Sequence, residues 1–286
     1  MPLDKGLAPA KINLALHVTG VRAGGYHLLD SLVAFAGVGD QLTALPAAEL
    51  TLEVTGPFSQ GVPVDETNSV LRAARHLQEL RGVTQGARLK LVKTLPHAAG
   101  IGSGSSDAAA ALRLLSQFWG VENFSPSDPE VLELGADVPV CLHAPAPARM
   151  RGIGEVLEPL PALPGCGLVL VNPGVEVPTG QVFEWLERSD NSALDALPER
   201  LDHAGFIEWL AAQRNDLQAP AEALAPEIGQ ALKRLRATPG VDLALMSGSG
   251  ATCIGLCRDM GRARQAARTI QLSQMGWWVA PAPLLS

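Results

Sequence analysis

Three places in the chain carry residues whose types and spacing could do chemistry together. The first is the glycine- and serine-rich stretch Pro96–Ala110, P-H-A-A-G-I-G-S-G-S-S-D-A-A-A. Its glycines let backbone N–H groups approach an anion, and the start of a following helix offers further unpaired N–H groups. The other two are Lys11, in the segment P-A-K-I-N, and Asp137, in G-A-D-V-P-V. Together the three places supply a phosphate cradle, a cation and a carboxylate.

The glycine-rich stretch departs from three known loop designs. No lysine follows its glycines, as a Walker loop would require, and Ser105 stands where the dinucleotide pattern needs its last glycine. Gly104–Ala108 nearly matches the nucleophile elbow of serine hydrolases, with Ser106 as nucleophile, but the last histidine, His203, has no matching context. Because a strand precedes the stretch and a strong helix follows it, we favour a phosphate-binding loop over a flexible linker.

Strands and helices must position these residues, and apolar periodicity predicts where they lie. Strands are expected at residues 10–20, 27–38, 40–55, 89–93, 166–172, 241–246 and 252–257. Helices are expected at 68–80, 107–119, 127–134, 181–188, 205–212, 219–236 and 261–275. The elements mix without a regular alternation, which favours an α+β fold over a doubly wound sheet. Prolines, glycines and arginines at 144–153 predict a boundary between an N-terminal domain, 1–150, and a C-terminal domain, 151–286.

Composition narrows the class of protein. The chain has 286 residues, 47% of them hydrophobic and 18% charged, which is enough for the cores of two domains. A net charge of −7 without a long basic cluster argues against a nucleic-acid partner. The N-terminus is unlike a signal peptide, and no apolar run reaches the ~20 residues of a membrane span, so we expect a cytoplasmic protein. The four cysteines lack a zinc pattern and are expected to be buried free thiols.

The sequence resembles the GHMP kinase superfamily, which includes galactokinase and the homoserine and mevalonate kinases. The superfamily's three motifs appear in order as PAKINLALHVTGVRAGGYH, PHAAGIGSGSSDAA and MSGSGATCIGL. The segments GYH, GADVPV and NPGVEVPTGQVF resemble the branch that phosphorylates 4-diphosphocytidyl-2-C-methyl-D-erythritol. The likeness extends from Pro9 to about Leu256. It implies a two-domain GHMP kinase fold with the active site in the cleft between the domains.

The resemblance implies phosphorylation of the 2-hydroxyl of that cytidine diphosphate methylerythritol, with ATP and Mg²⁺, in non-mevalonate isoprenoid biosynthesis. It also implies that Lys11 and Asp137 are the catalytic pair. The hydroxyl is tertiary and crowded, so Asp137 would accept its proton while Lys11 keeps the aspartate ionised and screens the phosphoryl charge. The metal ligands stay unassigned. We expect a monomer or weak homodimer.

The same resemblance implies the binding residues. Those expected at ATP are Asn68, near the adenine, and Pro96, His97, Ala98, Ala99, Gly100, Ile101, Gly102, Ser103, Gly104, Ser105 and Ser106. Those expected at the substrate are Asn13, Tyr26, His27, Thr179 and Phe183. Tyr26 and Phe183 would stack on the cytosine and His27 would read its polar edge, although Phe183 could instead be a core residue. The segment Ser247–Thr252 is expected near the catalytic centre rather than as a plain hairpin turn.

Other functions stay open at this point. One is a kinase for another small alcohol, such as homoserine or mevalonate, and another is a nucleotide-binding protein that has lost catalysis. The retention of Lys11 and Asp137 argues against loss of catalysis. A serine hydrolase that uses Ser106 is the least favoured.

Overall fold

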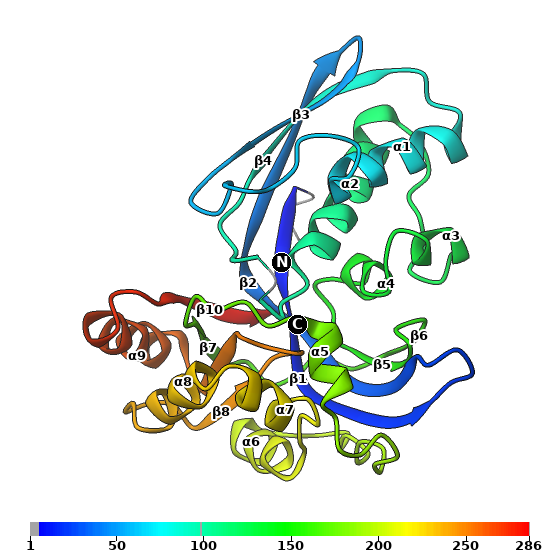
Figure 1. Cartoon of the computed structure of the whole chain (residues 1–286). Coiled ribbons are helices and arrows are strands. Elements are labelled where there is room, and N and C mark those ends of the chain that lie inside the picture. The colour runs from blue at the N-terminus through cyan, green and yellow to red at the C-terminus, as the bar shows by residue number, and fades with distance from the viewer. Residues whose placement is uncertain (1–5, 98, 286) are drawn as a thin grey trace. The chain divides into compact units, whose positions relative to one another are not determined.

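The computed structural model describes residues 6–97 and 99–285 (Figure 1). The chain folds into two compact units, and neither unit is one continuous segment. Unit 1 consists of Met1–Ala10, Gly39–His97 and Gly102–Ala144, and unit 2 consists of Lys11–Val38, Ala98–Ile101 and Pro145–Ser286. The change of unit after Ala144 lies near the expected boundary, but the chain also crosses between units before that point. A division into domains at residue 150 stays a prediction.

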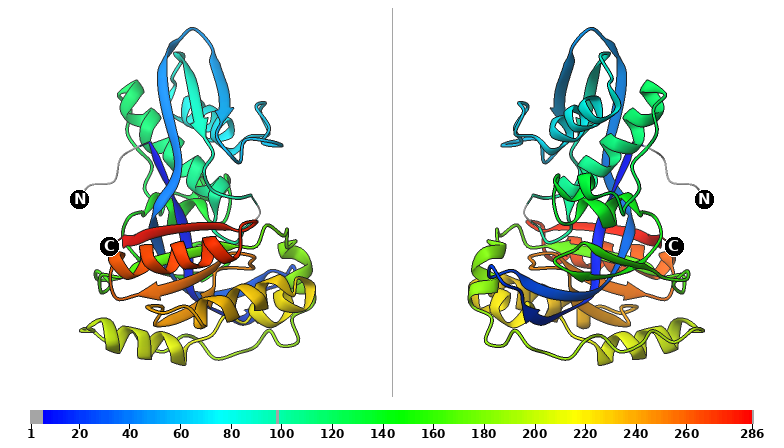
Figure 2. Two further views of the ribbon diagram at one scale, coloured as in Figure 1. Left: turned by 90° about the vertical axis from the view of Figure 1, so that its left-hand side faces the viewer. Right: turned by 90° about the vertical axis from the view of Figure 1, so that its right-hand side faces the viewer.

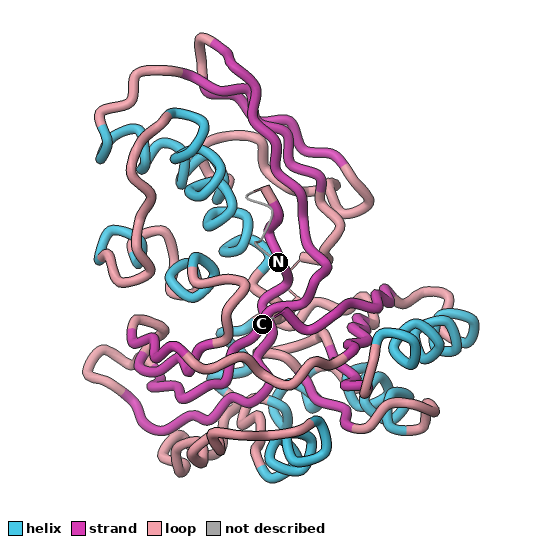
Figure 3. Tube along the Cα trace, turned by 180° about the vertical axis from the view of Figure 1, so that it is seen from behind, coloured by secondary structure: helices cyan, strands magenta, loops and turns pink. Residues whose placement is uncertain are grey.

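Strands and helices alternate irregularly along the chain, which confirms the α+β fold (Figure 3). The strands are β1 (Leu7–Val21), β2 (His27–Ala47), β3 (Leu50–Thr55), β4 (Gly86–Val92), β5 (Ala148–Gly152), β6 (Val156–Pro159), β7 (Gly167–Asn172), β8 (Leu243–Met246), β9 (Cys253–Cys257) and β10 (Trp278–Leu285). The helices are α1 (Ser69–Arg81), α2 (Ser103–Trp119), α3 (Pro129–Leu132), α4 (Val138–Leu142), α5 (Thr179–Glu184), α6 (His203–Ala212), α7 (Gln218–Leu224), α8 (Glu227–Arg236) and α9 (Met260–Ser273).

Unit 1 is built from the second half of β2, strands β3 and β4, and helices α1 to α4. Strand β4 pairs antiparallel with residues 41–47 of β2 and parallel with β3. Helix α1 packs against α2, and α2 packs against α4 (Figure 1). The buried run Ala108–Ala111 of α2 carries only methyl side chains, so neighbouring helices can approach its backbone closely. This packing fixes α2, whose first residues belong to the glycine-rich motif.

Unit 2 is built on an antiparallel sheet with helices packed against it. Strand β10 pairs with β7 and, at Ala36, with β2, while β9 pairs with both β7 and β8. Helices α8 and α9 pack on these strands (Figure 2). Every residue of β7 is buried, as expected for a strand covered on both faces. The core is aliphatic, with side chains such as Val169, Ile228 and Ile270.

Several element boundaries differ from the predicted ones. Helix α2 begins at Ser103 rather than Asp107, because Gly102 takes the left-handed conformation, with φ of 58°, that ends the loop. The single helix predicted at 219–236 is two helices, α7 and α8, separated at Pro226, since proline interrupts helical hydrogen bonding. The elements that the sequence analysis missed are α4, β5, β6 and β10. All four cysteines are buried free thiols, as predicted.

Candidate active site

Three motif segments meet at the hydroxyl of Ser247 in unit 2. Ser247 Oγ accepts a hydrogen bond from the backbone N–H of Asn13, in the first motif, at 3.1 Å. It donates to the carbonyl of Gly100, in the second motif, at 3.0 Å. The third-motif loop closes on itself, because the N–H of Ser247 donates to Thr252 O and that of Gly250 to Ser247 O. One buried hydroxyl therefore joins all three motifs.

Two glycines allow the second and third motifs to approach each other backbone to backbone. Gly100 has a φ of 70°, and a Cβ there would lie 2.4 Å from Ser247 O. Gly248 has a φ of 57°, and a Cβ there would lie 2.8 Å from Gly100 O. A side chain at either position would be strained by its backbone conformation and would collide with main-chain atoms. Both motifs therefore need glycine at these positions, because any side chain would prevent their contact.

Two asparagines hold this meeting point from either side. Asn215 Nδ2 donates to Met246 O at 2.9 Å and to Gly248 O at 2.8 Å, so it anchors the third motif. Asn13 Nδ2 donates to Ser31 Oγ at 2.8 Å. The Oδ1 atom of Asn13 is buried and has no hydrogen-bond partner among the described residues. A buried acceptor without a donor is costly, so this amide oxygen is the atom of Asn13 best suited to a ligand.

Three of the residues expected at the substrate lie together in unit 2. Thr179, the first residue of α5, places its hydroxyl 2.8 Å from that of Ser249 in the third motif. One turn later, Phe183 stacks on the ring of His27, with centroids 4.8 Å apart and planes 22° apart. Tyr26 is 64% exposed at the turn between β1 and β2. The structure thus brings Thr179, His27 and Phe183 together beside the third motif.

The first turn of α2 in unit 1 has backbone N–H groups that make no hydrogen bond within the helix. Ser106 N–H makes the first intrahelical bond, to Gly102 O, at 2.8 Å. No described side chain caps the helix at Gly102. The N–H groups of residues 103–105 therefore point out of a 17-residue helix toward any anion placed at its positive end. Of the residues predicted at ATP, Ala98 lies outside the described residues.

Two residues predicted at ATP use their side chains to hold the fold. Asn68 caps α1, since its Oδ1 accepts from Val70 N–H at 2.8 Å and its Nδ2 donates to Pro63 O at 2.7 Å. Ser106 Oγ is 2.7 Å from Pro9 O, to which it donates, and its residue is 1% exposed. That geometry leaves Ser106 buried and bonded to the backbone, so it gives no support to a serine nucleophile.

A buried ionic group that the sequence did not predict lies where the glycine-rich loop begins and ends. We call it the Lys93 cluster, made of Asp40, Lys93, Ser103 and Asp107. Lys93 Nζ donates to Asp40 Oδ2, to Ser103 Oγ at 2.6 Å and to Asp107 Oδ2 at 2.6 Å. A signal did exist, because residues 89, 91 and 93 share the buried phase of one strand, and a lysine in that phase must find partners.

The two members of the expected catalytic pair belong to different compact units, Lys11 to unit 2 and Asp137 to unit 1. Lys11 belongs to β1 in unit 2, is 5% exposed, and its backbone N–H donates to Ile101 O at 3.0 Å. Asp137 of unit 1 directly precedes α4 and is half-buried, and its carbonyl accepts from Cys141 N–H at 3.1 Å. The pairing of their side chains stays a prediction.

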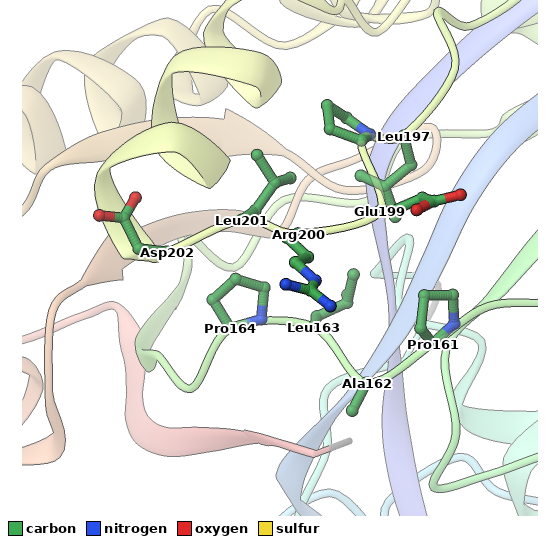
Figure 4. Close-up of a pocket in the computed structure, with 10 residues that line it drawn as sticks. Pro161, Ala162, Leu163, Pro164, Leu197, Glu199, Arg200, Leu201 and Asp202 are labelled. Atoms are coloured by element: carbon green, nitrogen blue, oxygen red, sulfur yellow. The ribbon is translucent and has the colours of Figure 1, made fainter.

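A cavity elsewhere in unit 2 is lined by none of the predicted site residues. It has a volume of about 390 Å³ and lies between the segments 161–164 and 197–202 (Figure 4). Within residues 6–97 and 99–285, no group of three or more His, Cys, Asp or Glu side chains could hold a metal ion. No helix in the same part of the chain is long and apolar enough to cross a membrane.

Family models match both parts of the chain. The model of the GHMP kinase N-terminal domain matches residues 68–146, and that of the GHMP kinase C-terminal domain matches residues 193–273. A protein of Cereibacter sphaeroides (strain ATCC 17029 / ATH 2.4.9) is 54% identical over 99% of this chain and 100% of its own length. A protein of Paramagnetospirillum magneticum is 54% identical over 98% of each chain. Both are named 4-diphosphocytidyl-2-C-methyl-D-erythritol kinase.

Solved structures agree with these relatives. A crystal structure of 4-(cytidine 5'-diphospho)-2C-methyl-D-erythritol kinase superposes with a TM-score of 0.79, at 34% identity over 98% of each chain. A homoserine kinase from Cytophaga hutchinsonii superposes with a TM-score of 0.64 at 18% identity, which shows the shared fold alone. The chain therefore belongs to the GHMP kinase family and is related over its whole length to the 4-diphosphocytidyl-2-C-methyl-D-erythritol kinases.

Proposed function

We propose that this protein transfers the γ-phosphoryl group of ATP to the 2-hydroxyl of 4-diphosphocytidyl-2-C-methyl-D-erythritol. The observation that carries the choice of substrate is the stacked pair of His27 and Phe183 beside Thr179 and the third motif. Flat rings with a polar edge suit a cytosine, whereas a small aliphatic alcohol has no ring that could stack on them. Relatives with this activity in their names match the chain at about half identity from end to end.

In the proposed reaction, Asp137 accepts the proton of the attacking hydroxyl and Lys11 stabilises the charge that develops on the transferred phosphoryl group. Asn13 Oδ1, a buried acceptor without a partner among the described residues, would orient the acceptor sugar. Tyr26 would close over the cytosine from its exposed turn.

The nucleotide would lie with its phosphates at the start of α2. The N–H groups of residues 103–105 supply hydrogen bonds there, and glycines leave room for the phosphate oxygens. We write the nucleotide substrate as MgATP, because Mg²⁺ is commonly held by substrate phosphates and water. The proposal also includes a step in isoprenoid precursor biosynthesis, a cytoplasmic location and a monomer or weak homodimer.

The test is a coupled ADP-release assay with three acceptors at equal concentration. We expect turnover with 4-diphosphocytidyl-2-C-methyl-D-erythritol, and less than about a hundredth of it with homoserine or mevalonate, because a site built around a base loses that binding with other acceptors. Equal or faster turnover with either alcohol would overturn the choice of substrate. ATP binding without turnover of any acceptor would support a nucleotide-binding protein that has lost catalysis.

A further inference from the structure

The Lys93 cluster contains more negative than positive charge in a place that water does not reach. Lys93 is 2% exposed, Asp107 3% and Asp40 is fully buried. One ammonium therefore faces two carboxylates. Because a buried charge without compensation is far costlier than a neutral group, one of the two carboxyls should carry a proton.

The hydrogen bonds identify which carboxyl that is. Asp40 accepts from the N–H groups of Thr94 at 2.6 Å and Leu95 at 2.9 Å, from Ser103 Oγ at 3.3 Å, and from Lys93. Asp107 accepts only at Oδ2, from Lys93, and its buried Oδ1 has no hydrogen-bond partner within the described residues. Donors favour the ionised form of the group that receives them, so Asp40 is the carboxylate and Asp107 the acid.

The same contacts tie together the two ends of the glycine-rich loop. Thr94 and Leu95, at its entry, donate their backbone N–H groups to Asp40. Ser103, at its exit and the first residue of α2, accepts from Lys93 and donates to Asp40. All three donors of the Lys93 ammonium are used inside the cluster, so this lysine sets the shape of the loop and does not reach for phosphate.

We propose that Lys93 is a positioning residue that holds the nucleotide loop closed at its root, and that Asp107 carries the proton that keeps the cluster neutral while phosphate occupies the loop. This rests on the nucleotide role proposed above for the loop. Loss of the proton would leave a net negative charge beside the phosphates. Nucleotide affinity should therefore weaken as Asp107 ionises.

The surroundings of Asp107 agree with this assignment. Burial raises the pKa of Asp107 to about 7; Lys93 opposes the rise and Asp40 adds to it. Lys93 follows β4 and Asp40 belongs to β2, so both charged neighbours come from the sheet. Of the helices packed on α2, α4 has no charged residue. Helix α1 has Arg72, Arg75 and Glu79 at exposed positions and His76 and Arg81 at half-buried ones.

Calorimetric titration with the non-hydrolysable ATP analogue AMP-PNP and Mg²⁺ tests the proposal on the whole chain. Titrations at pH 6.5, 7.5 and 8.5, each in two buffers of different ionisation enthalpy, report both Kd and proton uptake. We expect the wild-type Kd to rise by roughly five- to tenfold from pH 6.5 to 8.5, since one linked proton changes affinity at most tenfold per pH unit. Binding near pH 7.5 should take up a fraction of a proton.

Two variants separate the proton from other effects. Asp107→Asn keeps the shape of an uncharged Asp107, so at pH 6.5 its Kd for AMP-PNP should lie within about twofold of the wild-type value. The variant should also lose the pH dependence of Kd and the proton uptake that Asp107 causes in the wild type. Glu122→Gln removes the same charge from an exposed position of unit 1 and should behave like the wild type. The titration of the nucleotide itself is common to all three proteins. An Asp107→Asn profile that follows the wild type would overturn the proton assignment.

The positioning role has its own readout. Ser103→Ala removes one contact of Lys93 with the loop exit while leaving the buried charges in place, so the fold should survive. We expect its Kd for AMP-PNP to rise about tenfold while the KM of the cytidine substrate stays unchanged. An unchanged Kd would overturn the positioning role.

These outcomes are separable from those of the proposed function. The AMP-PNP titrations need no phosphoryl acceptor. A failed ADP-release assay together with a pH-dependent Kd would therefore reject the proposed acceptor and leave the inference about Lys93 and Asp107 in place. Turnover with a pH-independent titration would remove this inference alone. Absence of AMP-PNP binding at every pH would remove both.

Discussion

Among single residues, Asp137 has the largest expected effect on the reaction. Asp137→Ala should lower kcat by about 10²–10⁴-fold, the usual contribution of a positioned general base. Binding of AMP-PNP and of cytidine diphosphate should stay near wild type, because neither ligand carries the hydroxyl on which Asp137 acts. ADP release and calorimetry measure the two properties separately. A variant that kept a tenth of the activity would show that Asp137 is not the base.

Tyr26 should affect the acceptor substrate alone. Its side chain is 64% exposed, so Tyr26→Ala removes no core packing and should leave the melting temperature unchanged. Stacking of a base on an aromatic ring contributes roughly 1–3 kcal/mol, so the KM of the cytidine substrate should rise about tenfold or more. The KM of ATP serves as the internal control. Equal changes in both constants would place Tyr26 outside the cytidine pocket.

Residue type predicts which side chains come together better than how each side chain is used. Three of the residues expected at the substrate, His27, Thr179 and Phe183, do lie together beside the third motif. Asn68 and Ser106 show the opposite case, since each bonds to the backbone of its own chain. An amide or hydroxyl can serve a ligand or a neighbouring peptide group equally well, and only the folded contacts decide between them.

At the scale of elements, the contact between the second and third motifs depends on missing side chains. Gly100→Ala should lower stability by about 1 kcal/mol through its left-handed φ and by further energy through the collision with Ser247 O. Gly82→Ala is the matched control, because its φ is 65° and a Cβ there would meet no described atom within 4 Å.

Thermal melts and AMP-PNP titrations of both variants isolate the collision from the backbone strain. We expect both glycine variants to lose stability and only Gly100→Ala to lose nucleotide affinity, because a Cβ at Gly82 would touch no described atom of either motif. If the two variants behaved alike, the close approach of the two loops would have no part in nucleotide binding.

Element boundaries were the least predictable feature of the sequence. Serine and glycine disfavour helices, so propensity alone places the start of the second-motif helix at Asp107. In the fold, α2 includes Ser103 and Gly104 because contacts of Ser103 and Ser106 hold that turn in place. Such contacts come from residues far along the chain, so local propensity could not reveal them. The four-residue shift matters, since it moves the free N–H groups to residues 103–105.

For the whole molecule, His17 predicts how stability depends on pH. Its Nδ1 lies 3.0 Å from Ser192 O and its Nε2 accepts from Arg214 N–H at 3.2 Å, an arrangement that requires a neutral ring. Burial, and next Arg214, lower the pKa of His17 from its usual 6.5. The neutral ring therefore stabilises the fold above pH 6.5, and this contribution is lost as pH falls through the lowered folded-state pKa.

Melting temperatures from pH 8 to pH 5 check this expectation. The wild type should lose stability over the acidic part of that range more steeply than His17→Gln, which cannot gain a proton. Parallel curves for the two proteins would assign the acid loss to other groups.

The sequence predicts the fold class because the spacing of apolar residues indicates both helices and strands along the chain. The division of the chain into units did not, since a composition change marks only a place where elements stop. The segment Lys11–Val38 belongs to unit 2, although most of the chain that follows it directly belongs to unit 1. Assignment of that segment depends on strands that come much later, such as β10, which no local pattern identified.

This order of segments has a consequence during protein synthesis. Residues 11–38 leave the ribosome early, yet Ala36 pairs with Leu284, so part of their sheet cannot form until the last strand has been translated. At about 5–20 residues per second, the early hairpin waits on the order of ten seconds or more with an unpaired edge. Unit 1 can assemble in that interval, whereas unit 2 must finish after it. Nascent chains halted before β10 should therefore be the ones that aggregate or recruit chaperones.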